Sequence, residues 1–184
     1  MILQFKIQLV IVKPAVWRRV VVPANFSFDK FHWVIQEAFG WRGYHLYQFS
    51  PDGYGSYPTI GIPSEEYEEE FTDSRKLKLV KIFDSPGQKF VYNYDFGDDW
   101  EHKITLETLM DVTSKNAALL AGKGACPPED CGGPHGYVDM LRIINTPQHS
   151  ERQEMLEWLE MEEGETWNIN FFDLTNAHNR VVKI

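Results

Sequence analysis

Residues 90–107, FVYNYDFGDDWEHKITLE, decide the fold. Apolar and aromatic side chains occupy every second position on both sides of a short acidic turn. They are Phe90, Tyr92, Tyr94 and Phe96 before the turn, and Trp100, His102, Ile104 and Leu106 after it. A period of two with aromatic and β-branched residues is typical of half-buried strands. The stretch therefore predicts an aromatic β-hairpin, with Gly97 taking the positive φ that a tight turn requires.

Burial of the aromatic face would leave the acidic residues of this stretch on the opposite face or on the turn. One interpretation is a solvated rim above an aromatic core, because turns are enriched in Asp for local hydrogen-bonding reasons. The other is a functional site. The candidate catalytic residues are then Asp95, Asp98, Asp99, Glu101 and His102.

Length and composition indicate one globular domain, residues 1–184, with 43% hydrophobic and 14% aromatic residues. Eighteen basic residues against 27 acidic ones give a net charge of −9. Nucleic-acid binding needs a basic surface that neutralises phosphates, so this balance makes DNA or RNA an unexpected partner. We interpret Arg18 and Arg19, the basic pair beside Trp17, as side chains that extend to solvent from a strand edge.

Apolar runs are too short for a membrane span. Polar residues interrupt the N-terminal segment MILQFKIQLVIVKP at strand spacing, which predicts a first strand and not a signal peptide. Two cysteines in 184 residues, with no export signal, indicate reduced thiols in the cytoplasm.

The rest of the chain alternates between strand and helix patterns. Strands are expected at 2–12, 16–22 and 46–49, a solvated acidic loop at 65–71, a helical turn at 74–81, helical character at 117–120, and strand spacing at 167–171. Four helices are expected. The first begins after the N-cap Ser27 and ends at Gly40, and the second spans 137–145 with Val138, Leu141 and Ile144 inward. The third runs from a capping box at Ser150 to Glu160, and the fourth spans 173–181 with Asp173 as its cap.

The only two cysteines lie in ACPPEDCGGPHGY at 125–137. Cys126, Cys131 and His135, with His102 as fourth ligand, are candidate ligands of a zinc site. The alternatives are a rigid Pro- and Gly-rich loop in which both thiols pack as small hydrophobic groups, a disulfide in an oxidising setting, or a cysteine nucleophile with a histidine base. The sequence leaves these alternatives open.

Carboxylates from the hairpin and the cysteine loop form a second candidate metal site. A hard divalent ion prefers carboxylate oxygens, and such an ion would support metal-assisted hydrolysis. The candidates are Asp95, Asp98, Asp99, Glu101, Glu129 and Asp130. The chain has no P-loop, dinucleotide fingerprint, nucleophile elbow or HExxH helix.

Four motifs carry a family resemblance: KPAVWRR at 13–19, GW at 40–41 with HLYQF at 45–49, YDFGDDWEH at 94–102, and ACPPEDCGGPHGY. Together they resemble the plasmid pRiA4b ORF-3-like protein family. The resemblance implies one compact α+β domain of a bacterium or archaeon, and its members occur alone, in fusions or beside mobile elements. It implies no biochemical activity. Residues 119–122 read Leu-Leu-Ala-Gly where the family pattern leads us to expect Cys-Leu-x-Gly, which weakens a family-type metal cage here.

We therefore expect an α+β fold: a mixed, largely antiparallel sheet with the aromatic hairpin at its centre, flanked by several helices. The hairpin turn and the cysteine loop should pack together and form one surface. The leading hypothesis is a binding or interaction module for an unknown small molecule or protein. Its candidate ligand-binding residues are Tyr94, Asp95, Trp100, His102, Glu129, Asp130 and His135. The alternatives are a metal-dependent hydrolase that uses the carboxylates and His102, and an accessory protein of mobile-element DNA transactions.

Overall fold

The structure is a computed structural model, and it describes residues 1–63 and 71–184. The loop predicted at 65–71 therefore lies, apart from Phe71, outside the described residues. The strands within these ranges are β1 (Ile2–Leu9), β2 (Trp17–Pro23), β3 (Tyr47–Ser50), β4 (Ile60–Gly61), β5 (Thr72–Asp73), β6 (Lys89–Tyr94), β7 (Trp100–Met110) and β8 (Ala118–Lys123). The helices are α1 (Phe28–Phe39), the 3-10 helix η1 (Leu79–Lys81), α2 (Gly133–Ile144), α3 (Arg152–Trp158) and α4 (Leu174–Val181).

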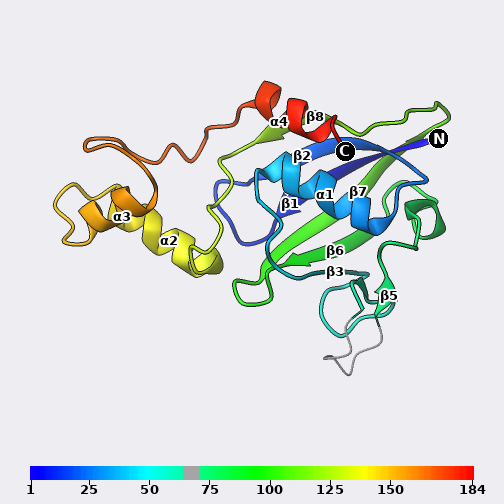
Figure 1. Cartoon of the computed structure of the whole chain (residues 1–184), viewed down its shortest axis with the longest axis horizontal. Coiled ribbons are helices and arrows are strands. Elements are labelled where there is room, and N and C mark those ends of the chain that lie inside the picture. The colour runs from blue at the N-terminus through cyan, green and yellow to red at the C-terminus, as the bar shows by residue number, and fades with distance from the viewer. Residues whose placement is uncertain (64–70) are drawn as a thin grey trace.

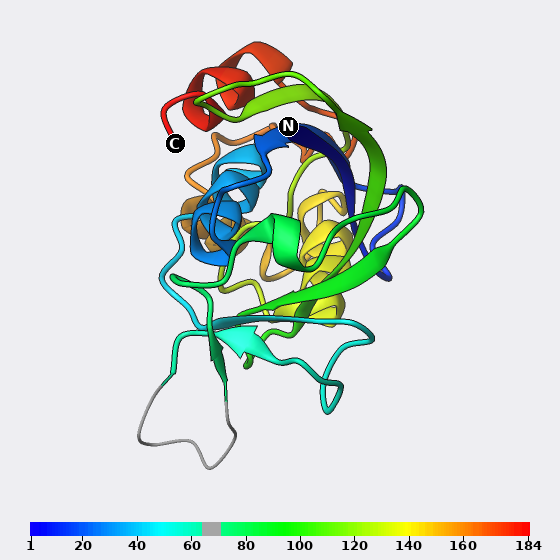
Figure 2. The same ribbon diagram turned by 90° about the vertical axis from the view of Figure 1, so that its right-hand side faces the viewer.

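The described strands form one sheet in the order β5-β4-β3-β6-β7-β1-β2-β8. Neighbouring strands are antiparallel except β4 and β5, which pair in parallel. The sheet curves around α1, while α4 lies along β8 (Figures 1 and 2). Helices α2 and α3 extend as an arm from one end of the sheet (Figure 1). The expected α+β fold with a mixed, largely antiparallel sheet is confirmed.

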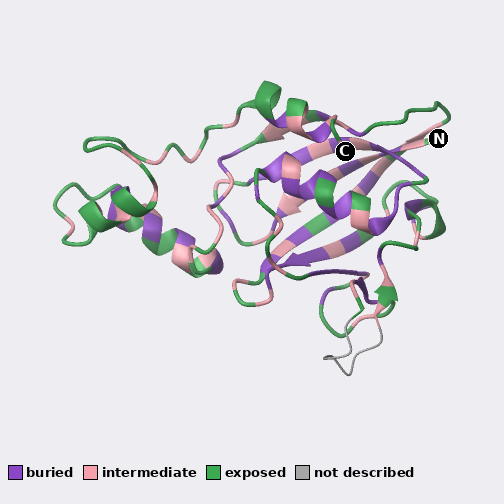
Figure 3. Ribbon diagram, in the orientation of Figure 1, coloured by how far each residue is buried: buried purple, intermediate pink, exposed green. Residues whose placement is uncertain are grey.

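The predicted hairpin is formed by β6 and β7, at the centre of the strand order. Its register pairs Tyr94 with Trp100 and Tyr92 with His102. The alternating apolar side chains of both strands are buried, and buried residues, in purple, recur along both strands in Figure 3. The predicted turn chemistry is wrong in one respect. Asp95 and Asp99, with φ of 58° and 53°, take the positive φ values, and Gly97 does not.

Helix α1 begins and ends as its sequence predicts. The Ser27 side chain accepts a hydrogen bond from the Lys30 N–H, and Gly40 ends the helix with a φ of 95°. The buried face includes Phe28 and Phe31, which lie against Phe49 of β3. The Asp173 cap of α4 is also confirmed, because its side chain accepts a hydrogen bond from Asn176 N–H.

Several local predictions are wrong. The segment 117–120 is not helical, because residues 118–120 belong to strand β8, which pairs with β2. Val138 is exposed on α2, whose buried residues are Gly133, Tyr137, Met140, Ile143 and Ile144. Helix α3 starts after Glu151 without a side-chain cap, so the Ser150 capping box does not form. No strand forms at 167–171, a fully described segment.

Arg18 was expected in solvent but is only 2% exposed. Its guanidinium lies 3.9 Å from the ring centroid of Phe172. It donates hydrogen bonds to the carbonyls of Trp17, Ala38, Lys123 and Gly124. A buried charge is tolerated when carbonyl acceptors replace water in this way. Arg19 behaves differently, because it forms a partly exposed ion pair with Glu107 at 2.6 Å.

None of the helices in the described residues is long and apolar enough to cross a membrane.

Candidate functional site

The hairpin turn between β6 and β7 is held by the side chain of Asp95. Its Oδ1 accepts hydrogen bonds from the N–H groups of Gly97, at 3.0 Å, and Asp98, at 3.3 Å. Its own N–H donates to the carbonyl of Leu46 at 2.9 Å, which ties the turn to the chain entering β3. Asp accepts this arrangement because its short side chain stabilises the left-handed conformation locally. The second oxygen, Oδ2, lies 3.6 Å from His45 Nδ1.

The cysteine loop packs directly against this turn, as the sequence predicted. Gly132 N–H donates to Asp98 Oδ2 at 3.2 Å. Gly133, with a φ of 68°, approaches Asp98 so closely that a Cβ at this position would lie 2.3 Å from the Asp98 carbonyl oxygen. Only glycine fits such an approach at a positive φ. The loop therefore has a fixed path over the hairpin.

Two further contacts attach the loop to the segment after α1. Trp41 Nε1 donates to the carbonyl of Pro127 at 2.8 Å. Glu129 accepts hydrogen bonds from Arg42 N–H, at 2.8 Å, and from the Tyr94 hydroxyl. Glu129 thus has a clear structural role, whereas the sequence argument named it as a candidate metal-binding and ligand-binding residue.

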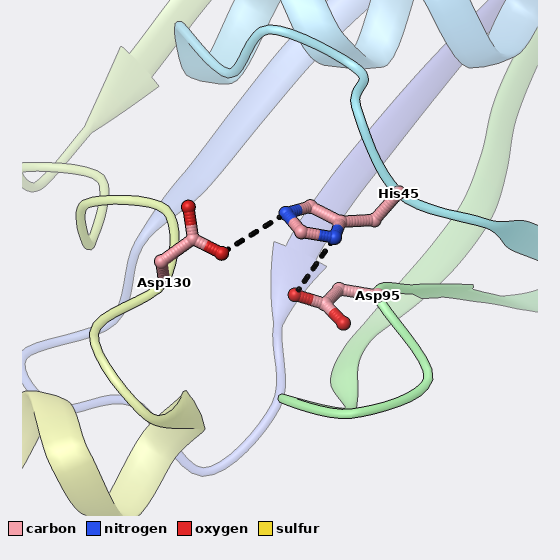
Figure 4. Close-up of side chains that lie close together, drawn as sticks. All are labelled: His45, Asp95 and Asp130. Atoms are coloured by element: carbon pink, nitrogen blue, oxygen red, sulfur yellow. Dashed lines mark ion pairs between the residues drawn. The ribbon is translucent and has the colours of Figure 1, made fainter.

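His45 joins the turn and the loop. Its Nδ1 lies 3.6 Å from Asp95 Oδ2, and its Nε2 lies 3.1 Å from Asp130 Oδ1 (Figure 4). The second distance fits an ion pair, but the direction of approach does not satisfy a hydrogen bond. Within the described residues Nε2 therefore has no hydrogen-bond partner, although that atom is shielded from solvent. We call His45, Asp95 and Asp130 the His–Asp cluster.

The His–Asp cluster can hold a metal ion. One ligand atom from each of its three residues lies within 4.8 Å of the other two, and it is the only such group in the described part of the chain. The sequence argument named Asp95 and Asp130 but did not include His45 among the candidate residues. The missing signal was strand register: the pairing of Tyr47 with Tyr94 places the residues just before β3 beside the turn that begins at Asp95.

The other predicted metal ligands are not brought together. In the described ranges, Cys126, Cys131, His135 and His102 do not place three ligand atoms within 4.8 Å of one another. His102 is fully buried, its Nδ1 lies 2.9 Å from the Trp100 carbonyl, and burial lowers its pKa to about 3. His135 is exposed on α2.

Both thiols are unpaired and partly buried. Burial raises the pKa of Cys126 well above its ordinary value and that of Cys131 to about 12. The thiolate is the nucleophile, so both cysteines are weakly reactive near neutral pH. This environment fits the packing interpretation of the loop better than a cysteine nucleophile.

Two hollows flank the His–Asp cluster. One, of about 250 Å³, is mainly apolar and is lined by His45, Trp33, Leu46, Phe71 and Phe96 among others. The other, of about 460 Å³, lies between the cysteine loop and the end of α3. We call it the aromatic–acidic groove. Its lining includes Trp41, Tyr44, Trp158 and Trp167 together with Glu129, Asp130 and Glu160, and Arg42 is its single basic residue.

The candidate residues therefore occupy different environments. Asp95 and Asp130 belong to the His–Asp cluster, and Glu129 and Asp130 line the groove. Tyr94 and Trp100 are core residues, exposed by 0% and 1%. Asp98 contacts the cysteine loop, whereas Asp99 accepts a hydrogen bond from Asn93 Nδ2 at 3.2 Å. Glu101 pairs with Asn93 across the hairpin.

Three comparisons with known proteins each cover nearly the whole chain. The chain is 38% identical over 178 residues to "Uncharacterized protein y4hQ" of Sinorhizobium fredii, which covers 96% of this chain and 90% of that protein. A solved structure, a protein of unknown function, MM3350, from Methanosarcina mazei Go1, has the same fold. Its TM-score is 0.78 and its identity 30%, with 95% of this chain and 96% of that chain covered. The profile of the family described as "Plasmid pRiA4b ORF-3-like protein" matches residues 1–176, and the chain belongs to this family.

Proposed function

We propose that this protein is a cytoplasmic binding module that takes a Lys- or Arg-bearing segment of a partner protein in the aromatic–acidic groove. The observation that carries the proposal is the joint lining of one hollow by aromatic faces and carboxylates. A cationic side chain is the ligand that both groups attract, through cation–π contact and through charge. The volume of about 460 Å³ falls within the usual range of ligand sites.

The exposure of the lining residues supports binding from solution. Trp158 is 47% exposed and Tyr44 is 73% exposed, so their rings are accessible beside the exposed carboxylates of Asp130 and Glu160. Large exposed aromatic side chains that cluster in one place are typical of interaction sites. The net charge of −9 favours the approach of a basic partner over that of a nucleic acid.

The basic residues named from the sequence offer little support for DNA as the ligand. Arg18 is buried against backbone carbonyls, and Arg19 is paired with Glu107. Neither is free to neutralise a phosphate, which is the main source of affinity for DNA. We therefore propose a protein, and not DNA, as the partner.

Isothermal titration calorimetry with tetralysine and tetraarginine peptides tests the proposal, with tetraglutamine as the neutral control. We expect weak 1:1 binding of the basic peptides that decreases with added NaCl, because exposed charges are screened by salt. Trp158→Ala and Glu160→Gln should each weaken binding by about fivefold, equivalent to about 1 kcal/mol. Glu154→Gln, an exposed residue of α3 outside the groove lining, is the matched control and should have no effect.

Two results would contradict the proposal. One is equal affinity for tetraglutamine and the basic peptides. The other is binding of the basic peptides that is unchanged in both Trp158→Ala and Glu160→Gln, since the peptide would then bind the acidic surface elsewhere.

A further inference from the structure

We propose that the His–Asp cluster is a binding site for a divalent first-row transition-metal ion. In this site His45 Nε2 and Asp130 Oδ1 bind the ion directly, and Asp95 orients the imidazole from the opposite side. The inference does not depend on the peptide groove, because His45 and Asp95 are not part of the groove lining. Asp130 alone belongs to both sites.

The contact between His45 and Asp130 has the geometry of two ligands and not of a hydrogen-bonded pair. The two atoms are 3.1 Å apart, yet the orientation leaves Nε2 without a hydrogen bond within the described residues. Nitrogen and oxygen ligands lie about 2.0–2.2 Å from zinc, so two of them bound to one ion are separated by about 3.0 Å at a 90° angle and about 3.4 Å at a tetrahedral angle. The observed spacing is therefore already that of a bound pair.

Asp95 lies where metal-binding histidines usually have a supporting carboxylate, at ion-pair distance from the second ring nitrogen of His45, and a small movement of its side chain would close this contact to a hydrogen bond. A histidine that binds a metal through one ring nitrogen generally directs the other toward a carboxylate or carbonyl, which fixes its tautomer and orientation. Here Asp95 Oδ2 lies 3.6 Å from Nδ1, and the other Asp95 oxygen is anchored by the turn amides. The turn thus holds the supporting carboxylate in place before any ion arrives.

The donor set indicates the class of ion. An imidazole nitrogen with a carboxylate oxygen suits zinc, and the absence of a thiol from the group argues against a soft, thiolate-bound ion. Asp130 is 67% exposed whereas His45 Nε2 is shielded, so solvent reaches the site from the Asp130 side. Water or a ligand atom would complete the coordination of the ion.

Titration of the full-length protein with Zn²⁺ in competition with a chromophoric chelator tests the inference. We expect one ion per chain. His45→Gln should abolish this binding, and Asp130→Asn should weaken it at least tenfold. Asp95→Asn should weaken it by about 10–100-fold, the usual effect of losing the carboxylate behind a metal-binding histidine. Asn still accepts the turn hydrogen bonds and tolerates a positive φ, so the turn should persist in this variant.

Matched controls separate this site from the cysteine loop. His135→Gln and Cys131→Ser should leave the affinity for Zn²⁺ unchanged. With Co²⁺ we expect visible absorption bands without a thiolate-to-cobalt charge-transfer band. Thermal unfolding of the metal-free variants checks that each one folds, and Asp130→Asn alters only an exposed side chain, so it remains informative if His45→Gln does not fold.

The inference is overturned if wild-type protein binds no Zn²⁺ at micromolar concentration, or if the affinity for Zn²⁺ is unchanged in both Asp130→Asn and Asp95→Asn. It is also overturned if Cys131→Ser or His135→Gln removes the ion, since the cysteine loop would then be the site. Wild-type protein that binds the basic peptides as expected but binds no Zn²⁺ would overturn this inference and leave the groove proposal intact, so the two ideas fail separately.

Discussion

The hydroxyl of Tyr94 in strand β6 donates a hydrogen bond to Oε1 of Glu129 in the cysteine loop, 35 residues away in sequence. Tyr94 is fully buried, and burial, followed by the nearby Glu129 carboxylate, raises the pKa of its phenol above the ordinary value. The phenol therefore stays protonated throughout the neutral range and remains able to donate this bond. The bond links the central hairpin to the surface that carries both proposed sites.

Tyr94→Phe should lower the free energy of unfolding by about 1–2 kcal/mol, because it removes the hydroxyl that donates a hydrogen bond to Glu129. Among the described residues, the Glu129 carboxylate would then keep only the Arg42 N–H as a hydrogen-bond partner. Urea unfolding at neutral pH measures the change. Tyr57→Phe, at a 72% exposed tyrosine, is the control and should change stability by less than about 0.5 kcal/mol. Equal effects of the two substitutions would mean that the link to Glu129 does not stabilise the fold.

Trp100→Ala should be among the most destabilising substitutions, with a loss of about 3–5 kcal/mol, because it opens a cavity under the hairpin. Trp100 is 1% exposed, and its ring lies 5.7 Å from that of Trp41. Chemical denaturation should show a much smaller effect for Trp158→Ala, whose ring is 47% exposed. A loss below about 1 kcal/mol for Trp100→Ala would contradict its role in the core.

The central hairpin could be predicted because its signal is local. Alternation of side chains over residues 90–107 reports directly which face of each strand is buried. The same holds for α1, whose cap residues Ser27 and Gly40 are adjacent to the periodic segment. Strand β8 was missed because the Ala- and Leu-containing residues near 117–120 favour a helix locally, while the strand is selected by pairing with β2, about 100 residues earlier.

The candidate site could be predicted only in part, for a similar reason. The contact between hairpin and cysteine loop followed from the acidic turn and the Pro- and Gly-rich loop. The place of His45 depends on the register between β3 and β6, which no short motif specifies. The burial of Arg18 likewise depends on carbonyl acceptors that come from separate segments, including Ala38 and Gly124.

Arg18→Lys should lower the free energy of unfolding by about 2–5 kcal/mol. The single ammonium group of lysine cannot reach all the backbone carbonyls that the planar guanidinium of Arg18 contacts, so some of these carbonyls would be left buried and unpaired. Burial lowers the pKa of Arg18 to about 10, so the group remains charged at neutral pH. Arg19→Lys is the matched control. Its ion pair with Glu107 is partly exposed, and its loss should cost no more than about 1 kcal/mol in the same denaturation experiment. A similar loss of unfolding free energy in Arg18→Lys and Arg19→Lys would show that the buried contacts of Arg18 do not stabilise the fold.

Acid should destabilise the fold through two buried histidines. His32 is 2% exposed, and burial lowers its pKa to about 3, as it does for His102. The ordinary pKa of histidine in an unfolded chain is about 6.5. Above that pH the two histidines are neutral in both the folded and the unfolded protein, so they do not reduce the free energy of unfolding. Between about pH 6.5 and pH 3 the unfolded chain binds protons that the folded protein excludes, so stability falls by about 1.4 kcal/mol per pH unit for each histidine.

His32→Gln should remove half of this histidine effect. The Gln oxygen can still accept the hydrogen bond that the Tyr92 hydroxyl makes with His32 Nδ1 at 2.7 Å, although the packing of the smaller side chain will lower stability at every pH. From pH 7.5 to pH 5.5, unfolding in urea should show a loss that is smaller by about 1.4 kcal/mol than in the wild type. His135→Gln, at an exposed histidine, should keep the wild-type pH dependence. An identical pH dependence in His32→Gln and the wild type would mean that His32 is protonated in the folded protein, which its burial beneath Tyr47 and Tyr92 opposes.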